Sequence, residues 1–294
     1  AAKNYSDVTV ITQVEQYNKL INELKKNHGS TSINFRNKMS EDAFNETAYY
    51  DAVIANYFKK QTKNFFPEKK IIFGKLFEKL RYGENPHQDG AIYSLDNNIN
   101  IKQLNGKQLS YNNYNDIFSA LLLSKSLPKN IGTVIIKHTN PSGVSINKDK
   151  IKSYRLALAC DPISAYGGIV SCNFKINKKL AIEFNNIFLE AVIGNGIDND
   201  ALKILKKRKN LRVIDAKNVK LENIQNINSN FNSILIQSPD NNFFSSKNFR
   251  IVSKKKPSFK MLKNMIFAFN VCRNVKSNGI VLIRNDTTVG IGSG

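Results

Sequence analysis

The chain has 294 residues, enough for about two domains and for a core that needs no disulfides. Its 41% hydrophobic content is typical of globular proteins, and no apolar run approaches the roughly 18 residues of a membrane helix. The formal charge of +21 would attract anionic substrates or nucleic acid, but the basic residues form short clusters without interleaved aromatics or a known nucleic-acid motif. The composition therefore favours a globular protein with no specific nucleic-acid partner.

The cysteines and the two ends of the chain give further expectations. Cys160, Cys172 and Cys272 are far apart and form no Cys-x-x-Cys pair, which indicates free thiols and a cytoplasmic location. No signal peptide is visible. The chain starts without Met and stops at GIGSG, so both ends are expected to be cuts through a longer protein.

Helical patterns dominate the first part of the chain. A short buried strand is predicted over 7–12, followed by an amphipathic helix over 13–27 with apolar residues at 3-4-3 spacing. A long helix is predicted over 40–61, with Ser40 as its cap. Residues 62–75 have no clear period and are expected to link two units.

Short strands alternate with helices in the remainder, which predicts an α/β fold with sheets between helices. Asn115 or Asp116 is expected to cap the first of these helices, and Asn285 and Asp286 to form a hairpin turn. The predicted strands are 90–95, 132–138, 167–173, 211–215, 233–238, 250–254 and 279–284, and the predicted helices are 115–127, 152–161, 200–210 and 258–275, with a helix running into a strand over 177–194.

The stretch VIIKHTNPSG ends a buried strand on two basic residues, Lys137 and His138. The chain is expected to turn through Asn140 and Pro141, and at this carboxyl end both side chains can reach one cleft. Imidazole transfers protons near neutral pH, and a neighbouring lysine disfavours its charged form. A solvated strand end explains these residues equally well.

Three other motifs carry candidate binding residues. LRYGENPHQ places Arg81, Tyr82 and His87 on a loop, where an arginine fork suits phosphate. Gly167 opens a Gly-Gly pair that lets backbone approach a ligand, and Asn278 in VKSNGIV can donate to a developing negative charge. Each motif alone also fits a surface loop, a turn or a helix end.

Together and in order, these motifs resemble the bifunctional AICAR transformylase/IMP cyclohydrolase family of purine biosynthesis. The resemblance covers essentially all 294 residues. It rests on LRYGENPHQ, LNGKQLSYNNYND, IIKHTNPSGV, DPISAYGGIV, ALKILKKRKNLRV and VKSNGIV with TVGIGSG, and on a front section similar to the end of the cyclohydrolase domain.

The resemblance implies a domain order and an architecture. Residues 1–65 would be the C-terminal part of a methylglyoxal-synthase-like IMP cyclohydrolase domain, and 66–78 a linker. Residues 79–294 would be a transformylase domain, truncated at its C-terminus, with a cytidine-deaminase-like α/β/α architecture and no catalytic zinc. VIGNG over 192–196 departs from the family's usual Ile-Ala-Pro and puts the local loop shape in question.

The resemblance also implies a reaction. The family transfers a formyl group from the cosubstrate 10-formyltetrahydrofolate to the 5-amino group of AICAR, giving FAICAR, and then cyclises this product to IMP with loss of water. His138 would be the base, Lys137 would set its protonation, Asn278 would steady the formyl oxygen, and Lys3 matches the cyclohydrolase lysine.

The same resemblance implies the binding residues and the assembly. Arg81, Tyr82 and His87 would bind the nucleotide, and Gly167 and Glu190 would line its pocket. The family forms homodimers with sites at the interface, needs no metal for its chemistry, and leaves room for a structural monovalent cation near VKSN. The 294-residue chain alone is expected to be inactive.

Two alternatives from other classes remain. A Schiff-base enzyme would use Lys137 as its nucleophile, and borohydride trapping of a carbonyl substrate would reveal it. A basic RNA-binding module would show salt-dependent binding that survives loss of His138.

Overall fold

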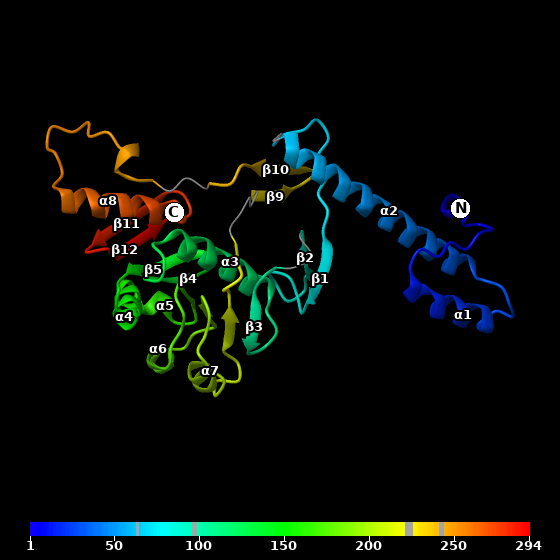
Figure 1. The fold of residues 1–294 in the computed structure, drawn as a ribbon, viewed down its shortest axis with the longest axis horizontal. Helices are drawn as coiled ribbons and strands as arrows, with labels where there is room; N and C mark the ends of the chain where they lie inside the picture. The colour runs from blue at the N-terminus through cyan, green and yellow to red at the C-terminus, as the bar shows by residue number, and fades with distance from the viewer. Residues whose placement is uncertain (63–64, 96–98, 221–225, 241–243) are drawn as a thin grey trace. The chain divides into compact units, whose positions relative to one another are not determined.

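The structure is a computed structural model in which residues 1–62, 65–95, 99–220, 226–240 and 244–294 are described (Figure 1). The chain divides into two compact units. Unit 1 consists of Ala1–Lys75 and Tyr93–Asn97, and unit 2 of Leu76–Ile92 and Asn98–Gly294. None of the helices in the described ranges is long and apolar enough to cross a bilayer.

Unit 1 is built on helices. The predicted helix over 13–27 is confirmed as η2 and α1, but the strand predicted over 7–12 is wrong. Every regular element within residues 1–62 is helical, so that segment has no neighbouring strand there to pair with. The elements are η1 (Ala2–Asn4), η2 (Val14–Gln16), α1 (Tyr17–Lys26) and α2 (Ile33–Thr62).

The long helix α2 exists as predicted but begins seven residues before Ser40, at Ile33. Ser32 caps it, because its Oγ accepts a hydrogen bond from the backbone N–H of Phe35 at 3.3 Å. Ser40 lies inside the helix, where it is buried and donates to the backbone oxygen of Ala2 at 2.6 Å. Acidic residues after Ser40 are typical of the first turn of a helix, which is why the sequence predicts the start there. The residues from Ile33 to Ser40 are equally compatible with a helix.

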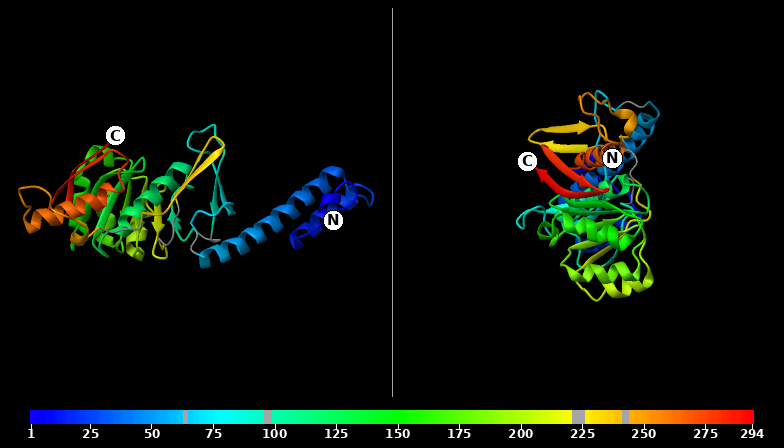
Figure 2. Two further views of the ribbon diagram at one scale, coloured as in Figure 1. Left: turned by 90° about the horizontal axis from the view of Figure 1, so that it is seen from above. Right: turned by 90° about the vertical axis from the view of Figure 1, so that its left-hand side faces the viewer.

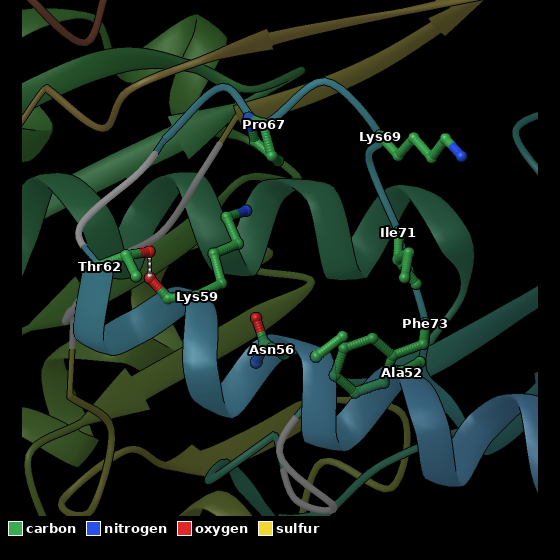
Figure 3. A pocket seen from close by; sticks show the side chains of 9 residues that line it. Ala52, Asn56, Lys59, Thr62, Pro67, Lys69, Ile71 and Phe73 are labelled. Carbon is green, nitrogen blue, oxygen red and sulfur yellow. Dashed lines mark hydrogen bonds between the residues drawn. The ribbon is translucent and has the colours of Figure 1, made fainter.

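The segment after α2 packs back along this helix within unit 1. The rings of Tyr49 and Phe73 meet edge to face, with centroids 5.7 Å apart. A cavity of about 180 Å³ separates the two segments, and Lys59 and Lys69 line it (Figure 3). Hydrogen bonding with Lys59, burial and the charge of Lys59 together lower the pKa of nearby Lys70 to about 8.

Unit 2 contains an eight-stranded mixed sheet in the order β11-β12-β5-β4-β6-β7-β8-β3. β6, β7 and β8 are parallel to one another, and the other neighbours are antiparallel. The predicted α/β class is therefore confirmed as a mixed α/β fold. The strands are β3 (Lys102–Asn105), β4 (Gly132–Lys137), β5 (Asn140–Ile146), β6 (Ile169–Cys172), β7 (Ala191–Gly194), β8 (Arg212–Asp215), β11 (Gly279–Arg284) and β12 (Thr287–Ser293).

Helices cover both faces of this sheet (Figures 1 and 2). Val134 and Ile136 of β4 belong to the apolar cluster of α3, whereas Ile135 between them belongs to the cluster of α4, α6 and α7. The predicted burial of this strand on both faces is thus confirmed. The helices are α3 (Tyr111–Ser126), α4 (Lys150–Cys160), α5 (Pro162–Ala165), α6 (Lys178–Glu183), η3 (Phe184–Asn186), α7 (Asn199–Leu205), η4 (Ser246–Asn248) and α8 (Phe259–Cys272).

The smaller strand pairs confirm some predictions and correct others. β2 (Gly90–Ser94) pairs with β1 (Lys75–Leu80), and the hairpin turn at Asn285 and Asp286 joins β11 to β12, with φ values of 51° and 59°. β10 (Ser233–Gln237) pairs with β9 (Asn226–Asn230), an Asn-rich strand that hydrophobicity does not reveal. The strand predicted over 250–254 is wrong. Its two apolar residues, Ile251 and Val252, suggest a strand but do not provide a neighbouring strand to pair with.

Candidate functional site

The β4–β5 hairpin carries the Lys-His pair. His138 and Thr139 form its two-residue turn, with φ values of 51° and 63°, and Lys137 pairs with Asn140 across it. This left-handed geometry is the type preferred in tight hairpins. The predicted turn through Asn140 and Pro141 is therefore wrong, since both residues already belong to β5.

The position of the turn in the sheet follows from the pairing of β4 with β6. β4 runs antiparallel to β6, so Ile136 near the end of β4 pairs with Ile169, the first residue of β6. The carboxyl end of β4 consequently meets the amino ends of β6, β7 and β8. The rule that ligands sit at the carboxyl ends of parallel strands thus does not apply to this turn, which belongs to an antiparallel strand.

Lys137 is held against the segment that contains Gly167. Its Nζ donates to the backbone oxygen of Tyr166 at 2.8 Å. Gly167 has φ +73°, and its N–H donates to the backbone oxygen of Phe188 at 2.9 Å. The Tyr166 and Phe188 rings also contact each other, with centroids 5.3 Å apart. The ammonium of Lys137 is thereby fixed beside the glycine that the sequence singles out.

Asp116 of α3 holds the turn from another side. Its Oδ1 accepts the backbone N–H of Thr139 at 2.6 Å. Burial raises the pKa of Asp116, while the Thr139 amide and the nearby His138 and Lys276 oppose that rise. The sequence suggests Asp116 only as a helix cap, and that role is wrong: Ser110 caps α3, with its Oγ accepting the backbone N–H of Asn113.

The loop that carries Asn278 also reaches the turn. The backbone N–H of Lys276 donates to Oδ1 of Asn140 at 3.1 Å. Asn278 follows two residues later and is exposed, and its backbone oxygen accepts the N–H of Gly294 at 3.1 Å. Segments more than a hundred residues apart in the chain thus meet at one hairpin turn.

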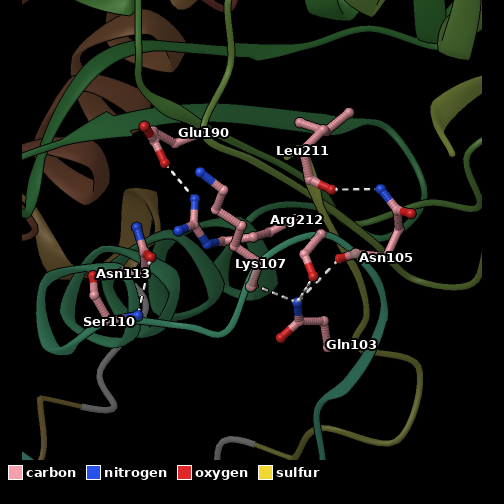
Figure 4. A network of polar contacts seen from close by, with 9 residues as sticks. Gln103, Asn105, Lys107, Ser110, Asn113, Glu190, Leu211 and Arg212 are labelled. Carbon is pink, nitrogen blue, oxygen red and sulfur yellow. Dashed lines mark hydrogen bonds and ion pairs between the residues drawn. The ribbon is translucent and has the colours of Figure 1, made fainter. Parts of the chain in front are cut away.

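Glu190 lies one strand further along the same end of the sheet. Its backbone N–H donates to the oxygen of Gly168 at 3.1 Å, and its carboxylate pairs with the guanidinium of Arg212 (Figure 4). Arg212 is only 6% exposed, and its Nε has no hydrogen-bond partner in the described part of the chain. Arg212 is not among the site residues predicted from the sequence, although a charged residue directly before the apolar pair Val213 and Ile214 is the available signal.

The loop with Arg81, Tyr82 and His87 is held in shape by contacts between its own residues. The guanidinium of Arg81 lies 5.5 Å from the centroid of the Tyr82 ring, and the Gly83 N–H donates to the backbone oxygen of Gln88 at 2.6 Å. Across residues 65–95 and the rest of the described chain, His87 makes no hydrogen bond or ion pair. Its side chain is exposed.

Helix α3 connects this loop with the turn. The Nδ2 of Asn112 donates to the backbone oxygen of Glu84 at 3.2 Å. Asn112 and Asp116 are four residues apart, so they share one face of α3. One helix face therefore holds the arginine loop through Asn112 and the Lys-His turn through Asp116.

Lys3 lies elsewhere in the chain, in η1 of unit 1, where it is exposed. Its proposed role belongs to the other reaction and does not depend on the turn. In the described residues, no group of three or more His, Cys, Asp or Glu side chains is placed to hold a metal.

The loop over 192–196 has a shape that requires its glycines. A Cβ on Gly194 would lie 2.6 Å from the backbone oxygen of Gly196, and Gly196 itself has φ +95°. An Ala-Pro sequence would not fit this geometry. The glycines that depart from the expected pattern are thus the residues that this loop's own backbone requires.

Comparison with known proteins decides the family. All residues from 1 to 294 match the family described as AICARFT/IMPCHase bienzyme. The chain belongs to this family. The resemblance found in the sequence is therefore confirmed.

Among the curated relatives in the AICARFT/IMPCHase family, three are each named bifunctional purine biosynthesis protein PurH. The protein from Prochlorococcus marinus is 41% identical over 308 residues, that from Clostridium kluyveri 40% over 298, and that from Bradyrhizobium diazoefficiens 37% over 302. Each match covers 100% of this chain. The chain spans only 57–59% of these relatives' own length.

Proposed function

We propose that the protein containing this chain transfers a formyl group from 10-formyltetrahydrofolate to the 5-amino group of AICAR in de novo purine biosynthesis, and then cyclises FAICAR to IMP. The observation that carries the proposal is the meeting of three distant segments at the β4–β5 turn. Lys137 contacts the backbone beside Gly167, and the loop of Asn278 contacts Asn140. The names of the relatives support the same pathway.

The chemistry follows from the groups at the turn. The AICAR amine attacks the formyl carbon, and His138 accepts the proton that this nitrogen loses. Asn278 donates to the formyl oxygen while it carries negative charge. The bond from the formyl carbon to N10 of the folate then breaks, and N10 takes up a proton to leave as tetrahydrofolate. Lys137, held by the backbone oxygen of Tyr166, would set the protonation of the imidazole.

The nucleotide would be held around this turn. Arg81 suits the phosphate, and Tyr82 and His87 flank it on the same loop. Gly167 and Glu190 would line the pocket for the base. α3 supports this arrangement because Asn112 and Asp116 hold the loop and the turn from one helix face.

We also propose a division of the chain into domains. Residues 1–65 form the C-terminal part of a methylglyoxal-synthase-like cyclohydrolase domain, with Lys3 as its catalytic lysine, and 66–78 form a linker. Residues 79–294 form part of a cytidine-deaminase-like transformylase domain. The whole protein is a cytoplasmic homodimer, and a structural monovalent cation near VKSN belongs to the same proposal.

Turnover of AICAR tests the proposal. The protein is produced at the length of its relatives, and tetrahydrofolate release from 10-formyltetrahydrofolate is followed with and without AICAR. Release should depend on AICAR, and Arg81→Ala should raise the KM for AICAR about tenfold through loss of a charge-assisted contact. Arg250→Ala, at another exposed arginine, is the control and should leave the KM unchanged. AICAR-independent release, or none from the folded protein, would contradict the proposal.

A further inference from the structure

A second candidate site lies at the opposite end of the parallel strands. A cavity of about 380 Å³ is lined by Lys125, Leu127, Lys129, Asn130, Asn173, Asn195 and Lys217. Asn173, Asn195 and Lys217 follow the carboxyl ends of β6, β7 and β8, and Lys125 lies in the last turn of α3. In open α/β sheets, this end of parallel strands is the usual place for ligands.

One wall of the cavity is fixed by Asn173. This residue is buried, and its Oδ1 accepts the N–H of Gly132 at 2.8 Å. Its Nδ2 donates to the backbone oxygens of Ser124 and Pro128, at 3.0 and 2.9 Å. Asn173 therefore links the end of α3 to β4 and fixes this wall of the cavity. Its own N–H groups are already used and are not available to a ligand.

The other polar groups at the cavity are unused. Across the described ranges of the chain, the side chains of Lys129, Asn130, Asn195 and Lys217 have no hydrogen-bond or ion-pair partner. Each of them carries hydrogen-bond donors. Four side chains that line one cavity are thus available to a ligand.

Lys125 adds a third cation from a more buried position. Its Nζ gives one hydrogen bond to the backbone oxygen of Ala216 at 3.0 Å, which leaves two N–H groups. Burial lowers the pKa of Lys125, and the nearby Asp215 carboxylate opposes this effect. Three lysines against one carboxylate leave a net positive charge at the cavity.

We propose that this cavity binds a small anion that carries phosphate groups. Lysine ammonium groups bind phosphate as point charges, and the free amides of Asn130 and Asn195 supply neutral donors to the same oxygens. The cavity is separate from the Lys-His turn, because the turn meets the amino ends of β6, β7 and β8 and the cavity their carboxyl ends. The proposal does not depend on the formyl transfer.

Calorimetric titration with pyrophosphate of the protein produced at the length of its relatives, at fixed ionic strength, tests this proposal. The double variant K129Q/K217Q should raise the Kd about tenfold or more, since two charge-assisted contacts are lost. K206Q/K207Q is the matched control, because it removes the same charge from exposed lysines between α7 and the amino end of β8. It should change the Kd less than twofold.

Other results would overturn the proposal. Equal weakening by both double variants would mean diffuse attraction to a basic surface, and an unchanged Kd in K129Q/K217Q would place the anion elsewhere, such as at Arg81. Citrate binding as tight as pyrophosphate binding would contradict the assignment to phosphate. Circular dichroism and thermal melting establish that both variants are folded, which is expected because Lys129 and Lys217 are exposed.

Discussion

The two ends of the parallel strands in unit 2 differ in how many of their charged side chains have partners. At the amino end, Lys137, Asp116 and Glu190 all contact other groups of the protein. At the carboxyl end, Lys129 and Lys217 line a cavity, and their side chains make no hydrogen bond or ion pair with any described residue. Groups that already have partners are fixed in orientation before any ligand arrives. Groups without partners are suited to binding.

The largest change in stability is expected at the amino end, when one partner of its ion pair is removed. Arg212→Met removes the buried partner of Glu190 and should lower the free energy of unfolding by about 2–3 kcal/mol, because an uncompensated carboxylate is left behind. The effect stays below that of a fully buried pair, since the Glu190 side chain is 38% exposed and can regain water.

Urea unfolding measures this loss. Lys203→Met is the control, because Lys203 pairs with Asp200 on the surface, where the two side chains are 80% and 65% exposed, and should cost no more than about 1 kcal/mol. Equal losses in the two variants would show that the Glu190–Arg212 pair contributes nothing beyond a surface ion pair.

Asp116→Asn gives a smaller effect that depends on pH. The pKa of Asp116 is raised in the folded chain, so its contribution to stability is present below the unfolded pKa and is lost as pH rises through the folded value. The asparagine variant lacks this loss and should gain stability relative to the wild type between pH 4 and pH 7. Urea unfolding at both pH values measures the change.

Asp161→Asn provides the control of opposite sign. Hydrogen bonds from the side chain and the backbone of Ser164 lower the pKa of Asp161, so its stabilising contribution is present above the unfolded pKa and lost as pH falls. This variant should not gain on the wild type as pH rises. A parallel response of the two variants would contradict the assigned causes.

The smallest change in stability is expected at the carboxyl end. K129Q/K217Q should alter the free energy of unfolding by less than about 0.5 kcal/mol, because these exposed side chains make no hydrogen bond or ion pair with the described residues. Urea unfolding without added phosphate measures it. A loss of unfolding free energy comparable to that of Arg212→Met would show that the two lysines stabilise the fold, which would contradict their availability to a ligand.

Strands and helices with strong local signals could be predicted from the sequence. The β-branched run before Lys137 predicts a strand buried on both faces, and the helix predicted over 258–275 is present as α8. The helix starts at Ser40 and Asn115 were wrong because several polar residues precede each helix, and only the backbone shows which one caps it. Strand 7–12 failed because pairing depends on neighbours that a local pattern does not contain.

The candidate site could be predicted as a set of residues but not as an arrangement. Lys137 and His138 are visible in the sequence, whereas the contact of Lys137 with Tyr166 depends on strand pairing between β4 and β6. Asp116 reads as a helix cap and acts instead on Thr139, 23 positions away. Such contacts follow from the register of the sheet, which no single motif encodes.

The most direct test of the central claim, that His138 is the base, replaces it with asparagine. Asparagine tolerates the φ of 51° at this turn, so the hairpin should survive while the imidazole is lost. His28→Asn is the matched control, because His28 is exposed and has a φ of 52°.

AICAR-dependent release of tetrahydrofolate is measured for both variants in the protein at the length of its relatives. His138→Asn should slow turnover by about 10²–10⁴-fold, the usual contribution of a general base, and His28→Asn should leave it unchanged. Turnover of His138→Asn within a few-fold of the wild type would contradict the account.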